Sequence, residues 1–270
     1  MKLSFPVETP GSDAPLMACR GDFESNLSMI HGIGYNAVEL LVRDPKEMDP
    51  EQTLRLLRKY SLKVSGIATS PMQKRDGLCL ISENREIREE CLSRCMKLTE
   101  TAAYLQAPII IGKLRGNIQE NGACTWNAMN QAIAKICEKA QKEHVHILIE
   151  PQNHNNINNL NTIDEALKWL AQMRFDNLGL LIDIFHMETT EKSIEASLVR
   201  AKDKIGLVHM TDSDRRVPST GRIPIYSILE VLNSVGYDGY LSMEIKQCPD
   251  SKTAARLSYE ILHYLDEFGS

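Results

Sequence analysis

Long apolar runs are missing from this chain. No stretch reaches the roughly 18–20 consecutive apolar residues that a membrane-spanning helix needs, and residues 1–7 lack the basic start and apolar core of a signal peptide. An excess of positive charge is missing too, because the formal net charge is -5. That balance argues against a general surface for nucleic acids or anionic membranes. We therefore expect a cytoplasmic protein with neither a membrane nor a nucleic-acid partner.

A regular cysteine framework is also absent. The seven cysteines are odd in number and irregularly spaced, so they predict no disulfide scaffold. Cys91 and Cys95 share one face of an expected helix, and Cys137 lies in another apolar helical pattern. We interpret them as reduced thiols in the core, as is usual for proteins of a reducing compartment.

Short apolar segments alternating with amphipathic stretches are what the sequence does contain. The expected strands cover residues 2–7, 37–42, 63–69, 108–114, 146–150, 178–183, 205–209 and 240–244. The expected helices cover residues 23–32, 50–60, 84–105, 126–143, 163–173, 193–201, 226–235 and 252–268.

This strict alternation predicts a parallel sheet, and eight units predict closure into an α/β fold, the (β/α)8 or TIM barrel. The length of 270 residues suits one such barrel of about 250 residues, although length alone would also allow two smaller domains. No stretch resembles a linker, so we expect one TIM-barrel domain over residues 1–270.

Four strands in the second half each end in a side chain that can bind a metal ion: Glu150, Asp183, His209 and Glu244. The C-terminal ends of barrel strands meet at the face where TIM-barrel active sites lie. Two Glu, one Asp and one His suit one divalent cation, for which we expect Mn²⁺ first and Mg²⁺, Co²⁺ or Zn²⁺ as alternatives. A single acid after a strand is often a helix cap, whereas four in register indicate a site.

The segments around these strands resemble the xylose-isomerase-like TIM-barrel superfamily. They are residues 150–154 (EPQNH), 183–186 (DIFH), 209–215 (HMTDSDR) and 242–244 (SME), with further similarity at 76–78, 86–88 and 217–223. Within that superfamily the similarity is to the sugar isomerase/epimerase branch, which includes ketose 3-epimerases and hydroxypyruvate isomerases. The resemblance implies that the four strand-end residues bind one metal and that His186 and Arg215 bind substrate. It also implies a homo-oligomer, a dimer or tetramer.

The residue types themselves fit proton transfer next to a carbonyl group. Removing such a proton needs a base and stabilisation of the enediolate, which a cation bound to the carbonyl oxygen supplies. Glu150 and Glu244 come from well-separated strands and are the expected catalytic bases. Transfer between opposite faces of one carbon gives epimerisation, and transfer between adjacent carbons gives aldose–ketose isomerisation. We therefore predict a metal-dependent isomerase or epimerase of a small sugar, keto-acid or sugar phosphate.

Three further residues are assigned with alternatives. Arg115, at the end of the fourth expected strand, either binds a substrate phosphate or carboxylate or is a loop cation. Glu39 is expected to orient a neighbour or a substrate hydroxyl rather than to bind metal. Asn156 stands where ketose 3-epimerases tend to carry a sugar-contacting acid. An amide can bind hydroxyls without bringing a charge, so the resemblance leaves the substrate open.

Structural alternatives exist for the ligands as well: a helix-capping acid for Glu150, buried hydrogen-bonded groups for Asp183 and His209, and a pair with Lys246 for Glu244. Three other functions share the fold. An inosose-dehydratase-like lyase would use the same enolate chemistry, and a non-catalytic sugar-binding barrel would need no paired bases. An endonuclease-IV-like phosphodiesterase would need early-strand histidines for three metals, yet no histidine occurs between His31 and His144.

Overall fold

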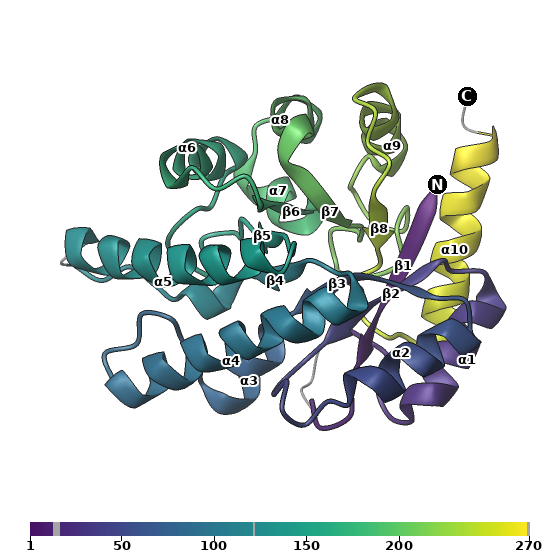
Figure 1. The fold of residues 1–270 in the computed structure, drawn as a ribbon. Helices are drawn as coiled ribbons and strands as arrows, with labels where there is room; N and C mark the ends of the chain where they lie inside the picture. The colour runs from purple at the N-terminus through teal and green to yellow at the C-terminus, as the bar shows by residue number, and fades with distance from the viewer. Residues whose placement is uncertain (13–16, 121, 269–270) are drawn as a thin grey trace.

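Eight parallel strands close into a barrel in the order β1 to β8 in the computed structural model, which describes residues 1–12, 17–120 and 122–268 (Figure 1). The strands are β1 (Lys2–Glu8), β2 (Ala37–Leu41), β3 (Lys63–Ala68), β4 (Ile109–Ile111), β5 (Ile147–Ile149), β6 (Leu178–Asp183), β7 (Ile205–His209) and β8 (Tyr240–Ser242). β1 pairs with both β2 and β8, which completes the ring. The predicted (β/α)8 fold is confirmed.

Helices surround this barrel. They are α1 (Phe23–Ile33), α2 (Pro50–Lys59), α3 (Ser70–Asp76), α4 (Arg85–Leu105), α5 (Gly122–Lys142), α6 (Ile163–Met173), α7 (Ile184–Thr190), α8 (Ile194–Ala201), α9 (Ile225–Ser234) and α10 (Ser251–Phe268), with short 3₁₀ turns η1 (Lys113–Arg115) and η2 (Lys202–Lys204). The long helices α4 and α5 lie side by side, and α10 packs against α1 (Figure 1). Among the described residues, no helix is both long and apolar enough to cross a bilayer.

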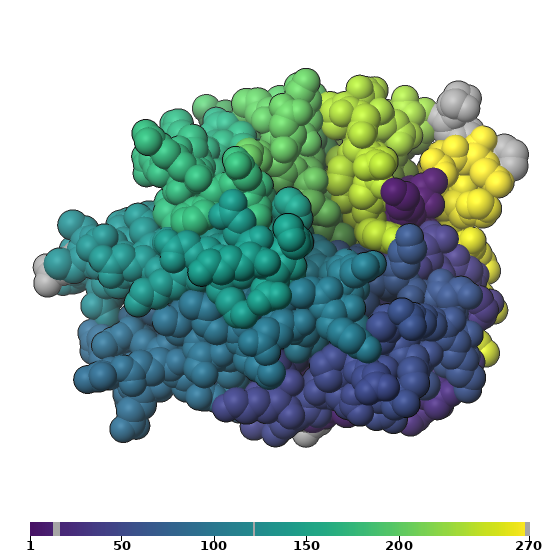
Figure 2. Space-filling view, viewed as in Figure 1, coloured from purple at the N-terminus to yellow at the C-terminus, as the bar shows by residue number. Residues whose placement is uncertain are grey.

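The amino terminus lies against the final helix. The amino group of Met1 lies 3.1 Å from Asp266 Oδ2 on α10. Figure 2 accordingly shows the purple N-terminal end next to the yellow final helix. This ion pair ties the start of β1 to α10.

Local sequence signals explain where several helices begin. The Asn84 side chain accepts a hydrogen bond from Glu86 N at 2.8 Å at the start of α4. Thr162 and Glu165 form a reciprocal capping box at the start of α6. Such caps satisfy backbone N–H groups that the first helical turn leaves without partners.

The fourth expected strand is shorter than predicted, and two helices were not predicted. Strand β4 ends at Ile111 rather than Leu114, because the backbone turns at Gly112 into η1. The short helices α3 and α7 have seven residues each and follow directly on β3 and β6. Neither is long enough to show a helical period of apolar residues.

The core has two parts, separated by the strands. Outward strand residues such as Leu180 and Ile182 pack against the helices, where Cys91, Cys95 and Cys137 are also buried as predicted. Inward residues form a small aliphatic cluster inside the barrel: Leu41, Ala68, Ile110, Leu148, Leu181 and Leu207, with Ala18 and the partly buried Tyr240. This inner cluster is an apolar layer beneath the strand ends.

Candidate active site

The alternation of strand side chains brings the four predicted ligands to the barrel axis. Side chains two residues apart on a strand point to the same side. Leu148, Leu181 and Leu207 belong to the inner cluster, and the next inward positions on their strands are Glu150, Asp183 and His209. Glu244 follows Ser242 of β8 by the same step. The ligands thus form one layer directly above the aliphatic one.

Asp183 is shared by two groups of converging ligand atoms. Asp183, His209 and Glu244 form one group, and Glu150, Asp183 and His186 form the other, each with its ligand atoms within 4.8 Å of one another. His209 Nδ1 lies 3.8 Å from Asp183 Oδ2 and 3.6 Å from Glu244 Oε2. The structure therefore brings all four predicted ligands together and adds His186 beside them.

Asp183 performs two functions with its two oxygens. Oδ1 accepts a hydrogen bond from Phe185 N at 2.9 Å and so caps α7. Oδ2 is buried and has no hydrogen-bond partner, although Arg215 Nη1 lies 2.8 Å away as an ion pair without hydrogen-bond geometry. The helix-cap alternative, raised for Glu150 in the sequence, thus applies to Asp183, whose other oxygen still faces the cluster.

His209 is oriented by a residue from the opposite half of the chain. Its Nε2 lies 2.8 Å from Glu39 Oε2, which also accepts a hydrogen bond from Ser242 Oγ at 2.7 Å. A carboxylate only accepts, so Nε2 donates its proton and Nδ1 faces Asp183 and Glu244. This contact agrees with the prediction that Glu39 orients a neighbour.

The donor set fits a divalent cation. Asp183 Oδ2 and His209 Nδ1 are buried without hydrogen-bond partners, which is costly for polar atoms unless something else binds them. Ligand atoms bonded to a cation at about 2.0–2.2 Å lie up to about twice that far apart, and the separations of His209 Nδ1 from Asp183 Oδ2 and Glu244 Oε2 fall within that limit. Carboxylates with imidazole suit several divalent metals, so the residues do not select one. The cluster is a candidate metal site.

Arg215 lies across the same cluster. Its Nη1 donates to Glu244 Oε2 at 2.6 Å, and its guanidinium stacks over the Phe185 ring at 4.2 Å. Its backbone has a φ of 61°, in the left-handed region, which turns the side chain back toward the barrel axis. The side chain is 9% exposed, so Arg215 is not a solvated loop residue although charged residues surround it in the sequence.

His186 is reached by two donors at one nitrogen. Arg215 Nη2 lies 3.2 Å from His186 Nε2, and Asn156 Nδ2 lies 3.4 Å from it. Because both neighbours are donors, Nε2 accepts and the neutral ring carries its proton on Nδ1. Burial, only partly offset by Asp183, lowers the pKa of His186 to about 4, with Arg215 lowering it further. His186 is therefore neutral at physiological pH.

The two predicted bases have raised pKa values. Burial and the neighbouring charges of Glu244 and Asp183 raise the pKa of Glu150 to about 8. Burial also raises the pKa of Glu244, against the opposing effects of Arg215 and His209. Once ionised, a carboxylate with a raised pKa is a stronger base than one with an ordinary pKa, which suits proton abstraction. Gln152 Nε2 donates to Glu150 Oε2 at 2.6 Å, an orienting contact that the sequence gave no signal to find.

The pKa values of the other two candidate ligands, Asp183 and His209, are shifted so that the charged form is favoured. Burial alone would raise the pKa of Asp183, but Arg215, His186 and His209 hold it well below its usual range. Burial likewise opposes charge on His209, yet Glu39, Glu244 and Asp183 raise its pKa well above the usual value. Without a cation, His209 and Arg215 therefore balance the carboxylates.

Arg115 lies beneath the site and away from open space. It is fully buried, and its Nε and Nη2 donate to Asn159 Oδ1 and the Asn159 carbonyl, both at 2.9 Å. Its Nη1 donates at 2.9 Å to the carbonyls of Gly112 and Glu150. Burial lowers its pKa to about 10, so it remains charged at neutral pH. Its contacts are to backbone and amide groups that hold the ends of β4 and β5 together.

A cavity of about 110 Å³ opens onto the cluster. Its walls include Glu150, His186, His209, Arg215 and Glu244, together with Glu39 and Asn156. Asp183 and Arg115 lie behind this lining. Six of the eight predicted site residues thus line the open space: Glu150, Glu244, His209, His186, Arg215 and Asn156.

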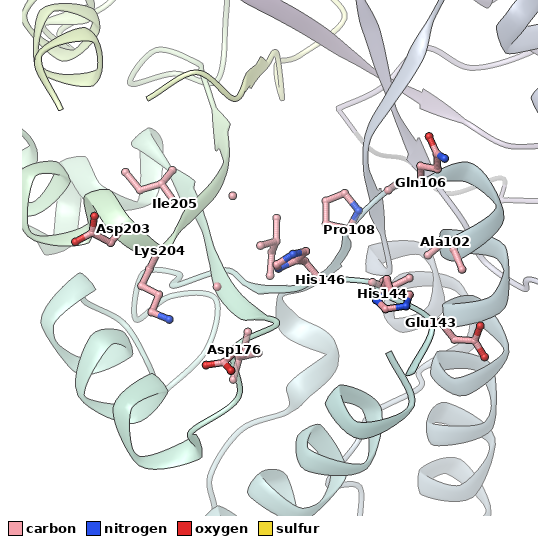
Figure 3. A pocket seen from close by; sticks show the side chains of 17 residues that line it. Ala102, Gln106, Pro108, Glu143, His144, His146, Asp176, Asp203, Lys204 and Ile205 are labelled. Atoms are coloured by element: carbon pink, nitrogen blue, oxygen red, sulfur yellow. The ribbon is translucent and has the colours of Figure 1, made fainter. Parts of the chain in front are cut away.

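A larger hollow of about 650 Å³ lies at the opposite end of the barrel, where strands β5 to β7 begin. Figure 3 shows Asp203 and Lys204 on one side of it and His144, His146 and Glu143 on the other. These side chains are spread around the rim and do not converge on one point. The N-terminal face of such barrels serves stability, so the smaller cavity is the candidate active site.

The chain matches the family described as xylose isomerase-like TIM barrel over residues 27–265. It is 26% identical to an L-ribulose 3-epimerase of Mesorhizobium japonicum over 231 residues, which cover 84% of this chain and 76% of the relative. It is 32% identical to the hydroxypyruvate isomerase of Escherichia coli over 121 residues, covering 44% of this chain and 46% of the relative. A D-allulose 3-epimerase from Methylomonas sp., crystallised with D-allulose, has a similar fold, with a TM-score of 0.79 and 20% identity over 97% of this chain and 96% of that one.

Proposed function

This chain belongs to the xylose isomerase-like TIM-barrel family, and on that premise we propose that it is a divalent-metal-dependent isomerase or epimerase of small sugars or related hydroxy-carbonyl compounds. The main support is one observation. Two glutamates with raised pKa values, the buried Glu150 and the half-buried Glu244, flank a cluster in which Asp183 Oδ2 and His209 Nδ1 lack hydrogen-bond partners. That arrangement joins a cation site to a pair of bases.

Each residue has a role in proton transfer next to a carbonyl. A divalent cation, when bound by Glu150, Asp183, His209 and Glu244, supplies Lewis-acid stabilisation of the negative charge that develops on the carbonyl oxygen. Glu150 and Glu244 remove and return the proton, because they come from β5 and β8 and approach the substrate from different sides. Such acid-base help typically contributes about 10²–10⁴-fold to the rate.

The substrate is positioned by the neutral and cationic groups around the cluster. Arg215 donates to developing oxygen charge and orients Glu244, to which it is already hydrogen-bonded. His186 offers its ring and Asn156 its amide to substrate hydroxyl groups at the cavity wall. Arg115 acts as a positioning residue, since its contact to the Glu150 carbonyl fixes the strand end from which that glutamate projects.

Hydrogen exchange tests this proposal directly. The protein with added Mn²⁺ or Mg²⁺ is incubated in D₂O with a panel of ketoses, keto acids and their phosphates, and NMR follows deuterium entering each carbon. We expect exchange at a carbon next to a carbonyl, and we expect Glu244→Gln and Glu150→Gln to lower its rate by at least about 10²-fold.

Two controls separate chemistry from folding. Glu51→Gln, on the exposed face of α2, leaves the rate unchanged, and thermal unfolding of each variant shows whether the barrel is intact. A dehydrated product would move the assignment to a lyase. Metal bound without exchange on any substrate would refute the proposed enolisation.

A further inference from the structure

One wall of the active-site cavity differs in charge from the rest. The cluster side contains the carboxylates, whereas the loops after β3 and β4 contribute Thr69, Ser70, Gln73 and two lysines, Lys74 and Lys113. Among the described residues that line this wall, there is no acid. This wall of the cavity therefore presents positive charge.

Lys113 is the more informative of the two lysines. It is exposed, and within the described part of the chain it makes neither an ion pair nor a side-chain hydrogen bond. Surface lysines are commonly solvated in this way, but this one follows directly on Gly112, whose missing side chain makes room for Glu150. A Cβ at Gly112 would overlap Glu150 Oε2 and lie 2.9 Å from Gln152 Nε2. The backbone of Lys113 thus begins beside one of the proposed bases.

Both lysine-bearing segments are held firmly. Arg115, two residues after Lys113, is bonded to the carbonyls of Gly112 and Glu150 and to Asn159. Helix α3, which contains Lys74, ends at Asp76, and Asp76 is paired with Arg43 at 2.9 Å and with Arg94. Because these anchors are shared with β2, β4, β5 and α4, the positive wall is a fixed part of the cavity.

The cavity is also small. Its volume of about 110 Å³ is the space of roughly four water molecules, well below the 300–1,000 Å³ of typical ligand pockets. The reacting carbons must lie at the glutamates, so little room remains before the substrate meets the lysine wall. A short substrate fills this space, whereas a hexose extends beyond it.

We infer that the substrate is a short hydroxy-keto acid whose carboxylate is bound at the lysine wall by Lys113, with Lys74 adding positive charge. This inference rests on the proposed isomerase or epimerase function and names its substrate class. An ammonium facing a carboxylate forms a charge-assisted hydrogen bond, which is about twice as strong as a neutral one. The same geometry leaves a neutral triose without this contact, so the site discriminates by charge.

Matched three-carbon probes test the inference. Hydroxypyruvate and dihydroxyacetone share a hydroxymethyl ketone and differ in the charge of the other end, and dihydroxyacetone phosphate supplies a phosphate in place of the carboxylate. D-fructose serves as a neutral six-carbon probe. Deuterium exchange in D₂O gives kcat and KM for each with the Mn²⁺-loaded protein, its Lys113→Met and Lys113→Arg variants, and Lys204→Met at the opposite end of the barrel as a matched control.

We expect wild-type kcat/KM to be at least about tenfold higher for hydroxypyruvate than for dihydroxyacetone. Lys113→Met should lower that ratio about tenfold, mainly through KM for hydroxypyruvate. Lys113→Arg should retain most of the preference, and Lys204→Met all of it. Because Lys113 is exposed, these variants should unfold at the wild-type temperature.

The failures are distinguishable. Exchange with dihydroxyacetone or D-fructose that equals or exceeds exchange with hydroxypyruvate, and is unaffected by Lys113→Met, overturns the inference and leaves the proposed function intact. Faster exchange with dihydroxyacetone phosphate overturns the carboxylate assignment in favour of phosphate. No exchange with any of the four probes overturns the inference, whereas the proposed function falls only if the wider panel of ketoses, keto acids and their phosphates also shows no exchange.

Discussion

Replacing Glu39 by glutamine removes a charge from the contact that orients His209 and leaves the shape of the side chain nearly unchanged. Glu39 is 1% exposed, and its Oε2 accepts from His209 Nε2 at 2.8 Å. In the wild-type protein this contact directs Nδ1 toward the cation site. The amide of the variant can still accept a hydrogen bond but no longer favours the positive charge that develops on a metal-bound imidazole.

The size of the effect follows from the surroundings of Glu39. Loss of such a partner typically lowers metal affinity by about 10–100-fold, which is about 1.4–2.8 kcal/mol. Ser242 Oγ also donates to the same oxygen at 2.7 Å and would hold an amide oxygen in its place. We therefore expect the lower half of that range for Glu39→Gln, about 10–30-fold weaker Mn²⁺ binding.

Isothermal titration of the metal-free protein with Mn²⁺ measures this change. Glu51→Gln, an exposed glutamate on α2, is the matched control and should bind like the wild type. An unchanged Kd for Glu39→Gln would refute the orienting role. Complete loss of Mn²⁺ binding would also refute the orienting role, because it would show that Glu39 itself is a ligand.

Two further predictions concern Arg115 and Glu150. Arg115→Met leaves four acceptors without their donor. We therefore expect the free energy of unfolding to fall by about 3–5 kcal/mol and Tm to fall by roughly 6–20 °C. Arg115→Lys should recover only part of this lost stability. Thermal and urea unfolding measure this; wild-type stability combined with lost exchange would instead support a substrate-binding role. For Glu150, a proton and a cation compete for a carboxylate whose pKa is about 8 in the metal-free protein. Mn²⁺ affinity should therefore rise with pH up to about that value, and Mn²⁺ binding near neutral pH should release a proton from Glu150. His209 also has a raised pKa, so it too should release a proton when the metal binds. Titration in two buffers of different ionisation enthalpy detects the release, and equal heats in both would contradict it.

The linkage of Glu150 to stability has a definite sign. Its folded-state pKa is raised, so the metal-free protein is more stable at a pH where this carboxyl is protonated than at a higher pH where it is ionised. That contribution is fully present below the unfolded pKa near 4.5 and is lost as the pH rises through about 8. A bound cation reverses the preference, because it favours the ionised carboxylate.

The sequence predicts well where the four candidate ligands lie, because their positions follow from local rules. An apolar run reveals a buried strand, strand alternation makes every second side chain face the axis, and the last such positions are Glu150, Asp183 and His209. Nothing beyond the strand ends and the barrel closure is required. The same rules place Glu244 two residues after Ser242.

Contacts between distant segments are what the sequence does not reveal. Glu39 and His209 are 170 residues apart, and only barrel closure brings them together. Arg115 stands beside glycines in the sequence, as an exposed loop cation would, yet it is fully buried because Asn159 returns over it from the loop after β5. Helix α7 was not predicted because no loop precedes it: Asp183 is both the last residue of β6 and the N-cap of α7.

The cavity is built by two kinds of segment with different freedom to change. The groups proposed to bind the ion and transfer the proton project from strand ends in the second half of the chain, where a shift of one residue would turn them away from the axis. The lysine wall lies on α3 and η1, which follow β3 and β4 in the first half. On the proposed role of the lysine wall, substitutions at positions such as Lys113 would alter what the site accepts without touching a strand that holds a candidate ligand. Over evolutionary time, a lineage with this barrel can therefore exchange one substrate for another while the reaction itself is inherited unchanged.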